Sequence, residues 1–301
     1  MNRPAPRSID QYLGQLRDAL KGEDPALVQD ALYDAEEYLR AEVASHAPKT
    51  EADVLELIAS TYGAPDEVAE AYRTTEKTVK EALKRPPPPP RRTLLGRFFG
   101  IYADSRAWTA LFYMLLALVT GIFYFTVTVT GLSLSAGLAV LIIGVPVFLL
   151  FIGLTRVLSL VEGRIVEGML GVRMPRRPLR STQGLSFGGR IKEMLLDRRT
   201  WTTLLYMLLM LPLGIIYFTA AVTGLALGVC GIAAPVVTIL HGLGLISGSI
   251  ELDGEYLAWP LTLPIALFGV VLTTALMHGV RALGELHGRL ARALLLSRDG
   301  E

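Results

Sequence analysis

The chain has 301 residues, of which 51% are hydrophobic, and its 29 basic and 28 acidic side chains give a net charge of +1. This balance gives no reason to expect a nucleic-acid partner, and a single cysteine excludes an intrachain disulfide framework. The charges are unevenly placed, because residues 1–85 carry 17 acidic and 11 basic side chains whereas residues 156–199 carry 10 basic and 4 acidic ones.

Residues 1–84 are predicted to form a cytoplasmic domain of three or four packed helices. Their start lacks the apolar core of a signal peptide, so we expect this segment to stay in the cytoplasm. Ser8, Asp24 (followed by proline) and Thr50 are placed to cap helices, and Gly63 is placed to end one. Each predicted helix has one apolar face, which must be buried against the others.

This segment resembles the small α-helical signalling domain called HAAS. The resemblance is carried by Tyr12–Leu20, by Tyr38-Leu39 and by the turn that runs from Tyr62 to Ala69. Tyr62 stands where the family pattern has leucine. The resemblance implies a non-enzymatic relay domain that lies beside membrane segments and often belongs to proteins encoded near transcription regulators.

Residues 85–93 are predicted to be a linker. Five consecutive prolines, 86–90, are flanked by arginines and favour polyproline II, which would give a semi-rigid spacer of roughly 15 Å. A ligand for an aromatic-grooved adaptor module is the alternative interpretation of this run.

The rest of the chain contains one segment twice, at residues 96–132 and again at 189–225. The two copies are offset by 93 positions and share 21 identities in 37. Each copy has more than twenty successive residues without a formal charge, which is enough to cross a hydrocarbon layer of about 30 Å. We therefore predict an all-α membrane protein whose membrane domain consists of two tandem repeats.

The first repeat, residues 94–188, is predicted to form a membrane hairpin. The first span covers about Trp108–Val129, a tight turn lies near Gly131, and the chain returns through about Leu134–Leu154. A helix that leaves the membrane and a basic segment follow, and positive charge of this kind is retained on the cytoplasmic side.

The second repeat, residues 189–297, allows four or five spans in total. The pattern around Arg281 and Gly288-Arg289 matches the pattern around Arg156 and Gly163-Arg164, which pairs the end of the last span with the end of the second. Four spans keep this basic end and the tail, 298–301, in the cytoplasm. We therefore favour four, with a loop near residues 247–258 outside the cell.

Candidate residues follow from this topology, and none of them is catalytic, cofactor-binding or metal-binding. The loop that would meet an external stimulus contains Glu251, Asp253, Glu255 and Trp259. The predicted interface anchors are Trp108, Trp201, Arg106 and Arg199, and helix packing is assigned to Gly131, Gly224, Gly228, Tyr124 and Tyr217.

Two further expectations concern polar groups inside the membrane. Tyr113 and Tyr206, which are equivalent in the repeat, are expected to pack between helices rather than to bind a ligand. The spans as drawn contain no acid, so no proton relay is predicted, and His241, His278 and His287 are expected to share no site.

The membrane segment also resembles the "putative sensor" domain of bacterial and archaeal proteins, which commonly precedes histidine kinases. The resemblance is carried by the run from Trp201 to Phe218 and by Val222–Leu225, and it covers about residues 94–297. It implies a multi-pass protein of the cell membrane that relays a stimulus without enzymatic activity or a cofactor. The expected partners are the bilayer, a regulator or kinase, and a second copy of the chain. A small transporter or transporter subunit and a membrane assembly factor are the alternatives.

Overall fold

The computed structural model describes residues 5–82, 93–139, 143–175, 196–248, 250–252 and 255–296. Nearly all of these residues are helical, and the exceptions include one short hairpin of two-residue strands. The fold class is therefore all-α, as predicted. The proline run and most of the basic segment between the two repeats, including Arg176, Arg177 and Arg180, lie outside the described residues.

The N-terminal part folds as four helices, in which three of the predicted cap positions are occupied. The side-chain oxygens of Ser8, Asp24 and Thr50 accept hydrogen bonds from backbone N–H groups at the starts of α1, α2 and α3, and Thr50 forms a capping box with Asp53. These helices are α1 (Ile9–Ala19), α2 (Pro25–Ser45), α3 (Glu51–Tyr62) and α4 (Pro65–Ala82).

A shared apolar core holds these four helices together. Leu16, Leu20 and Leu39 are fully buried within it. Tyr62 stacks on Tyr38 with ring centroids 4.3 Å apart, so the residue that departs from the leucine of the family pattern contributes to the core.

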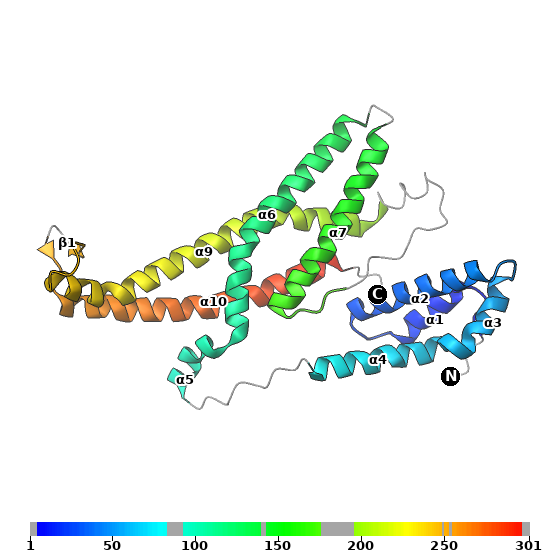
Figure 1. Cartoon of the computed structure of the whole chain (residues 1–301), viewed down its shortest axis with the longest axis horizontal. Coiled ribbons are helices and arrows are strands. Elements are labelled where there is room, and N and C mark those ends of the chain that lie inside the picture. The colour runs from blue at the N-terminus through cyan, green and yellow to red at the C-terminus, as the bar shows by residue number, and fades with distance from the viewer. Residues whose placement is uncertain are drawn as a thin grey trace.

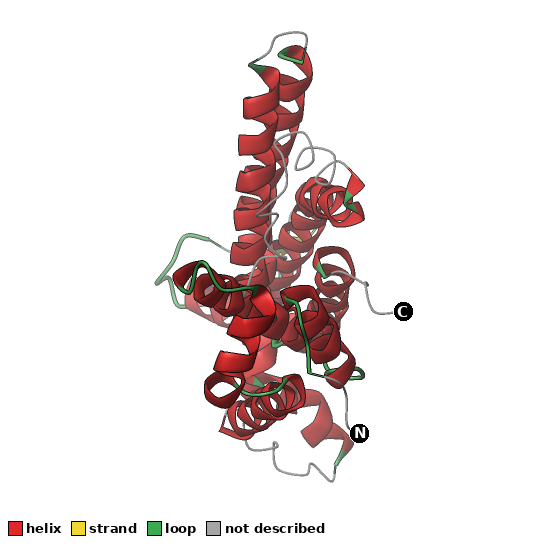
Figure 2. Ribbon diagram, turned by 90° about the vertical axis from the view of Figure 1, so that its right-hand side faces the viewer, coloured by secondary structure: helices red, strands yellow, loops and turns green. Residues whose placement is uncertain are grey.

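The membrane part begins with a short amphipathic segment and continues as two long hairpins (Figure 1). Figure 2, turned by 90°, shows the same predominance of helix with almost no strand. The elements are α5 (Leu94–Phe99), η1 (Gly100–Ala103), α6 (Ser105–Gly137), α7 (Gly144–Leu170), α9 (Arg198–Gly242), β1 (Glu251–Leu252), β2 (Glu255–Tyr256), η2 (Trp259–Thr262) and α10 (Leu263–Leu295).

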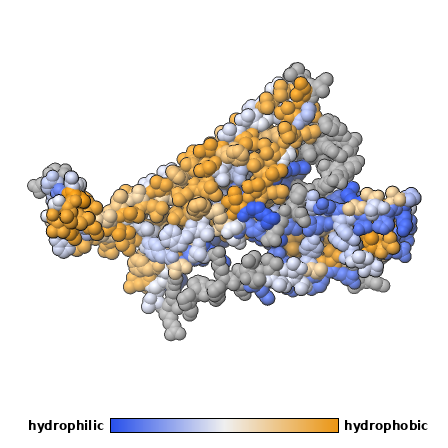
Figure 3. All heavy atoms as spheres, in the orientation of Figure 1, coloured by the Kyte–Doolittle hydropathy of each residue, from blue (hydrophilic) through white to orange (hydrophobic). Residues whose placement is uncertain are grey.

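Four of these segments are long and apolar enough to cross a membrane, and they are α6, α7, α9 and the segment formed by η2 and α10. Much of their apolar surface faces outward, as it would toward lipid: Phe112, Leu150 and Leu267, for example, are each more than 60% exposed. In Figure 3 the hydrophobic surface covers the two hairpins, and the hydrophilic surface is concentrated on the N-terminal helices. The protein is therefore a membrane protein with four candidate spans.

The predicted turn near Gly131 is wrong. Helix α6 continues to Gly137, so Gly131 lies within it. A side chain at Gly131 would collide with the ring of Phe151 on α7, so the glycine permits close packing of the hairpin rather than a turn. A glycine without a nearby breaker is tolerated inside an apolar helix, and this explains the error.

The region from residue 226 to residue 246 does not form a separate span. Helix α9 runs without interruption from Arg198 to Gly242 despite Pro212 and Pro235. Its 45 residues correspond to a length of about 68 Å. A short β-hairpin and η2 then lead into α10.

The two hairpins cross where α6 meets α9, and their turns lie on different sides of the molecule (Figure 1). A Cβ atom on Gly121 would lie 2.5 Å from the carbonyl oxygen of Met210, and one on Gly214 would collide with the carbonyl oxygen of Ala117. These two contacts are the same contact repeated, because each residue has its counterpart 93 positions away. The crossing therefore depends on two glycines that let the backbones touch.

Candidate functional site: a buried glutamate–histidine cluster

The most unusual polar group in the membrane part is the carboxylate of Glu162 on α7. It is 1% exposed. Its Oε1 accepts hydrogen bonds from the hydroxyls of Tyr113 (2.7 Å) and Tyr206 (2.8 Å), and its Oε2 accepts one from Tyr124 (3.0 Å). Three phenol donors from two helices therefore compensate a carboxylate that is removed from water.

His287 on α10 completes the cluster and is also 1% exposed. Its Nε2 lies 2.6 Å from the hydroxyl of Tyr113 and 3.1 Å from that of Tyr206, and its Nδ1 lies 3.2 Å from the hydroxyl of Tyr217. The imidazole and the carboxylate thus share two tyrosine hydroxyls as bridges.

One assignment of protons satisfies every group in this cluster. Three tyrosines donate to an ionised Glu162, Tyr217 donates to Nδ1 of a neutral His287, and Nε2–H points to the oxygen of Tyr113. If His287 takes up a second proton at Nδ1, its Nε2 proton can pass to the hydroxyl of Tyr113 while that hydroxyl gives its own proton to Glu162. The result is a neutral imidazole and a neutral carboxylic acid, and no heavy atom has to move. The cluster is therefore chemically able to hold and redistribute a proton within the helix bundle.

The cluster combines equivalent positions of the two sequence repeats. Tyr113 corresponds to Tyr206 and Tyr124 to Tyr217 at an offset of 93, and Glu162 corresponds to His287 at the offset of 125 that relates Arg156 to Arg281. Each hairpin thus contributes two tyrosines and one ionisable residue. The same rule extends to the helix ends, where Asp104 pairs with Arg281 at 2.6 Å and the corresponding Asp197 lies 3.9 Å from Arg156.

The expectation that the spans contain no acid is wrong. It depended on ending the second span near Leu154, whereas α7 is a single helix from Gly144 to Leu170 and carries Glu162 into the bundle. The three histidines share no site, as expected: His287 belongs to the cluster, whereas His278 contacts the backbone of Phe98 and His241 lies beside Tyr256. The offset of 125, applied to every polar residue of the two hairpins, would have paired Glu162 with His287.

The remaining predicted site residues lie in three other places. Trp108 and Trp201 are half exposed near the starts of α6 and α9, and Arg106 is exposed beside the first of them. Gly224 and Gly228 of α9 face Leu276 and Thr273 of α10, where added side chains would collide.

The predicted external loop is partly described. Glu251 lies in β1 and Glu255 in β2, which pair antiparallel, and Trp259 starts η2 with half of its surface exposed. Asp253 lies outside the described residues. The six residues of the buried cluster all come from α6, α7, α9 and α10 and none of them from this loop.

The four-helix domain contacts the ends of the membrane helices. Arg173, three residues beyond α7, is 14% exposed and reaches Asp30 of α2 at 3.2 Å and Glu76 of α4 at 3.4 Å. Arg292 near the end of α10 pairs with Asp24 at 3.1 Å.

A third contact comes from the start of α9. The guanidinium of Arg199 donates to the side-chain oxygen of Gln29 at 2.9 Å, so α2 touches three of the four membrane helices or the segments next to them. Sequence reasoning missed this docking surface because the partners are 97 to 268 residues apart in the chain and belong to no motif.

Comparison with curated proteins and with solved structures gave no match. A family model described as "Putative sensor" matches residues 113–295, a range that contains all six residues of the cluster and the larger part of the chain. The chain therefore belongs to this family.

Proposed function

We propose that this protein is a non-enzymatic sensor and relay of the cell membrane, in which rearrangement of the two hairpins changes how the cytoplasmic helical domain is held. The family assignment supports the sensor role. The HAAS resemblance supports the relay role, and a regulator or kinase is the partner it implies. The stimulus would act on the bilayer-embedded helices or on the loop between α9 and α10.

The observation that carries the proposal is the position of Arg173. The chain leaves α7 through Gly171, whose φ of +71° ends the helix, and places Arg173 against two acidic residues of the helical domain. A buried guanidinium that loses one carboxylate partner is strongly destabilised, so small shifts of α7 would be transmitted to α2 and α4. The same helix carries Glu162, which connects the buried cluster to the docking surface.

The relay predicts that Arg173→Ala will loosen the helical domain from the membrane part. We expect at least several-fold faster hydrogen exchange in the first turns of α2, around Asp24 to Asp30, measured on the full chain in nanodiscs. Arg164→Ala is the matched control, because Arg164 is half exposed and contacts Glu167 on its own helix. Unchanged exchange in Arg173→Ala would contradict the relay.

Partner recruitment tests the same proposal at the level of function. A regulator or kinase should co-purify from native membranes with the intact chain and not with a chain lacking residues 1–85. Equal recovery of the partner by both forms would overturn the assignment of the helical domain as the output.

The orientation is tested by labelling single cysteines after Cys230→Ala. Ser45 is exposed on α2 and Ser247 is exposed beyond α9. We expect an impermeant maleimide to label Ser247→Cys in intact cells and Ser45→Cys only after the cells are opened. Labelling of both from outside would contradict a cytoplasmic helical domain.

A proton-coupled transporter subunit is a second candidate, and the buried pair of Glu162 and His287 is the observation that favours it. This candidate predicts pH-driven flux into vesicles containing the reconstituted protein, abolished by Glu162→Gln. A relay predicts no flux and an effect of the same substitution on the exchange of α2.

A further inference from the structure

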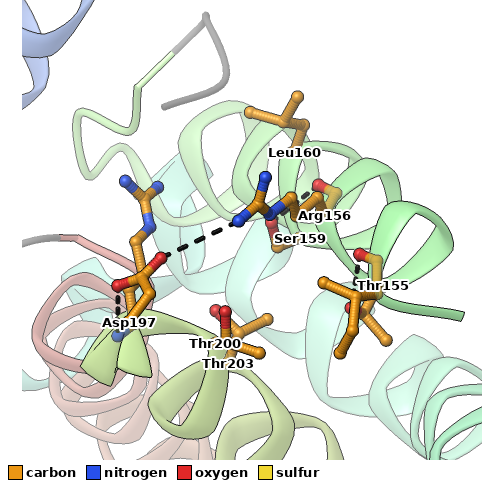
Figure 4. A pocket seen from close by; sticks show the side chains of 9 residues that line it. Thr155, Arg156, Ser159, Leu160, Asp197, Thr200 and Thr203 are labelled. Carbon is orange, nitrogen blue, oxygen red and sulfur yellow. Dashed lines mark hydrogen bonds and ion pairs between the residues drawn. The ribbon is translucent and has the colours of Figure 1, made fainter. Parts of the chain in front are cut away.

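A pocket opens where the middle of α7 meets the first turn of α9 (Figure 4). Its polar lining consists of Thr155, Arg156 and Ser159 from α7, of Asp197 at the N-cap of α9, and of Arg199, Thr200 and Thr203 from α9. These side chains come from different repeats and line one cavity that is partly open at the protein surface.

The pocket carries a net positive charge. Two guanidinium groups line it, and Asp197 is the one carboxylate in its lining. That carboxylate is occupied in capping α9, where it accepts the backbone N–H of Arg199 at 2.9 Å, and it lies 3.9 Å from the guanidinium of Arg156. The guanidinium of Arg156 therefore keeps N–H donors that can meet an anion.

Thr200 provides an independent sign that a ligand belongs here. The residue is 8% exposed, and its hydroxyl oxygen is buried with no hydrogen-bond partner among the described residues. Leaving such a group unpaired costs about 1–3 kcal/mol. In Figure 4 the hydroxyls of Thr200 and Thr203 lie on the floor of the pocket below Arg156 and Asp197, where a ligand oxygen would pair with them.

The repeat-equivalent place, where α6 meets α10, serves as an internal comparison. At the repeat-equivalent positions the four hydroxyl residues of the pocket are replaced by Ala107, Ala110, Val280 and Gly284. There the space is closed, because a Cβ on Gly284 would lie 2.9 Å from the Cβ of Ala110, and Asp104 and Arg281 form a close ion pair.

Only one of two equivalent places has thus become polar and open. The hydroxyls of Thr155 and Ser159 donate to the preceding helical turn, so a ligand would be met by the guanidinium of Arg156 and the hydroxyl of Thr200. Arg199 would join them only in exchange for its contact with Gln29.

The geometry points to a binding site for a phosphate group in this pocket, supplied either by an anionic lipid headgroup or by free phosphate. Arginine pairs and hydroxyls are the usual ligands of phosphate oxygens, and the pocket lies at the first turn of α9, the start of a candidate span, where headgroups are found. Arg199 also contacts Gln29 of the helical domain, so a ligand that engages Arg199 competes for that contact. This last effect rests on the proposed relay, whereas the binding does not.

Binding is measured on the full chain in phosphatidylcholine nanodiscs, in discs that also contain phosphatidic acid, and in phosphatidylcholine discs with added inorganic phosphate. We expect saturable retention of phosphatidic acid, seen by native mass spectrometry. Arg156→Gln and Arg199→Gln should each weaken it about 10-fold or more, and Thr200→Val, which is nearly isosteric and keeps the fold, several-fold. Arg106→Gln, at the repeat equivalent of Arg199, should change nothing.

The arms of this experiment separate the outcomes. Retention of phosphatidic acid that the pocket variants abolish identifies a lipid headgroup as the ligand. Retention of inorganic phosphate without retention of phosphatidic acid identifies a soluble ligand. Retention that is equal in the wild type and in Thr200→Val and Arg199→Gln, or absent in all arms, overturns the site. Because the readout is binding, failure of the relay would leave this result unaffected.

Discussion

Replacing Glu162 with leucine is expected to lower the free energy of unfolding in detergent by roughly 2–4 kcal/mol. The carboxylate accepts hydrogen bonds from three buried tyrosines, two of which also contact His287, and the substitution leaves these hydroxyls without their acceptor. Loss of helical circular dichroism during titration with sodium dodecyl sulfate measures the change.

The control is Glu285→Leu, because Glu285 lies on α10 with half of its surface exposed and its removal strands no buried donor. We expect that variant to stay within about 0.5 kcal/mol of the wild type. Equal losses in the two variants would show that the cluster contributes no more than a surface carboxylate does.

The repeat makes a sharper form of this experiment possible. Exchanging the two residues, as Glu162→His with His287→Glu, should recover part of the stability that either single substitution removes, because each position contacts three tyrosines, two of which are shared. Losses that simply add would mean that the two halves of the cluster are not interchangeable.

Gly121→Val and Gly214→Val are expected to be the most disruptive substitutions of small residues in the membrane part. Each places a side chain against a carbonyl group of the crossing helix, where backbone has to move, and overpacking of this kind costs typically 1–3 kcal/mol. The same unfolding titration measures the loss, and the double variant should lose the α6–α9 contact altogether.

Gly153→Val on α7 is the matched control, since nothing lies within 4 Å of a Cβ at that position. If all three valine variants are equally stable, the crossing does not depend on close backbone contact.

The sequence was sufficient to predict the four helices of the N-terminal domain, their caps and the membrane spans. Caps and long uncharged runs are local signals, and Asp24 before Pro25 or the stretch after Trp108 can be interpreted without tertiary information. The positions of the turns were harder to predict from the sequence. Gly131 stands where the sequence pattern favours a turn, yet its role is decided by the ring of Phe151 on another helix.

The buried cluster could not be predicted for a related reason. A charged residue after an apolar run normally marks the end of a span, and Glu162 comes six residues after Arg156. Whether it meets water depends on three tyrosines from two other helices. The docking of Arg173 on Asp30 and Glu76 is likewise set by the fold, because acidic side chains are numerous throughout the N-terminal domain.

The length of α9 has a mechanical consequence. At about 68 Å it is more than twice the thickness of a hydrocarbon layer of about 30 Å, so it fits only by leaning roughly 60° from the membrane normal or by projecting beyond the lipid. If α9 is tilted, a thinner or thicker bilayer changes its tilt angle. The helix would then rotate about its crossing point with α6, where Gly121 and Gly214 let the backbones touch.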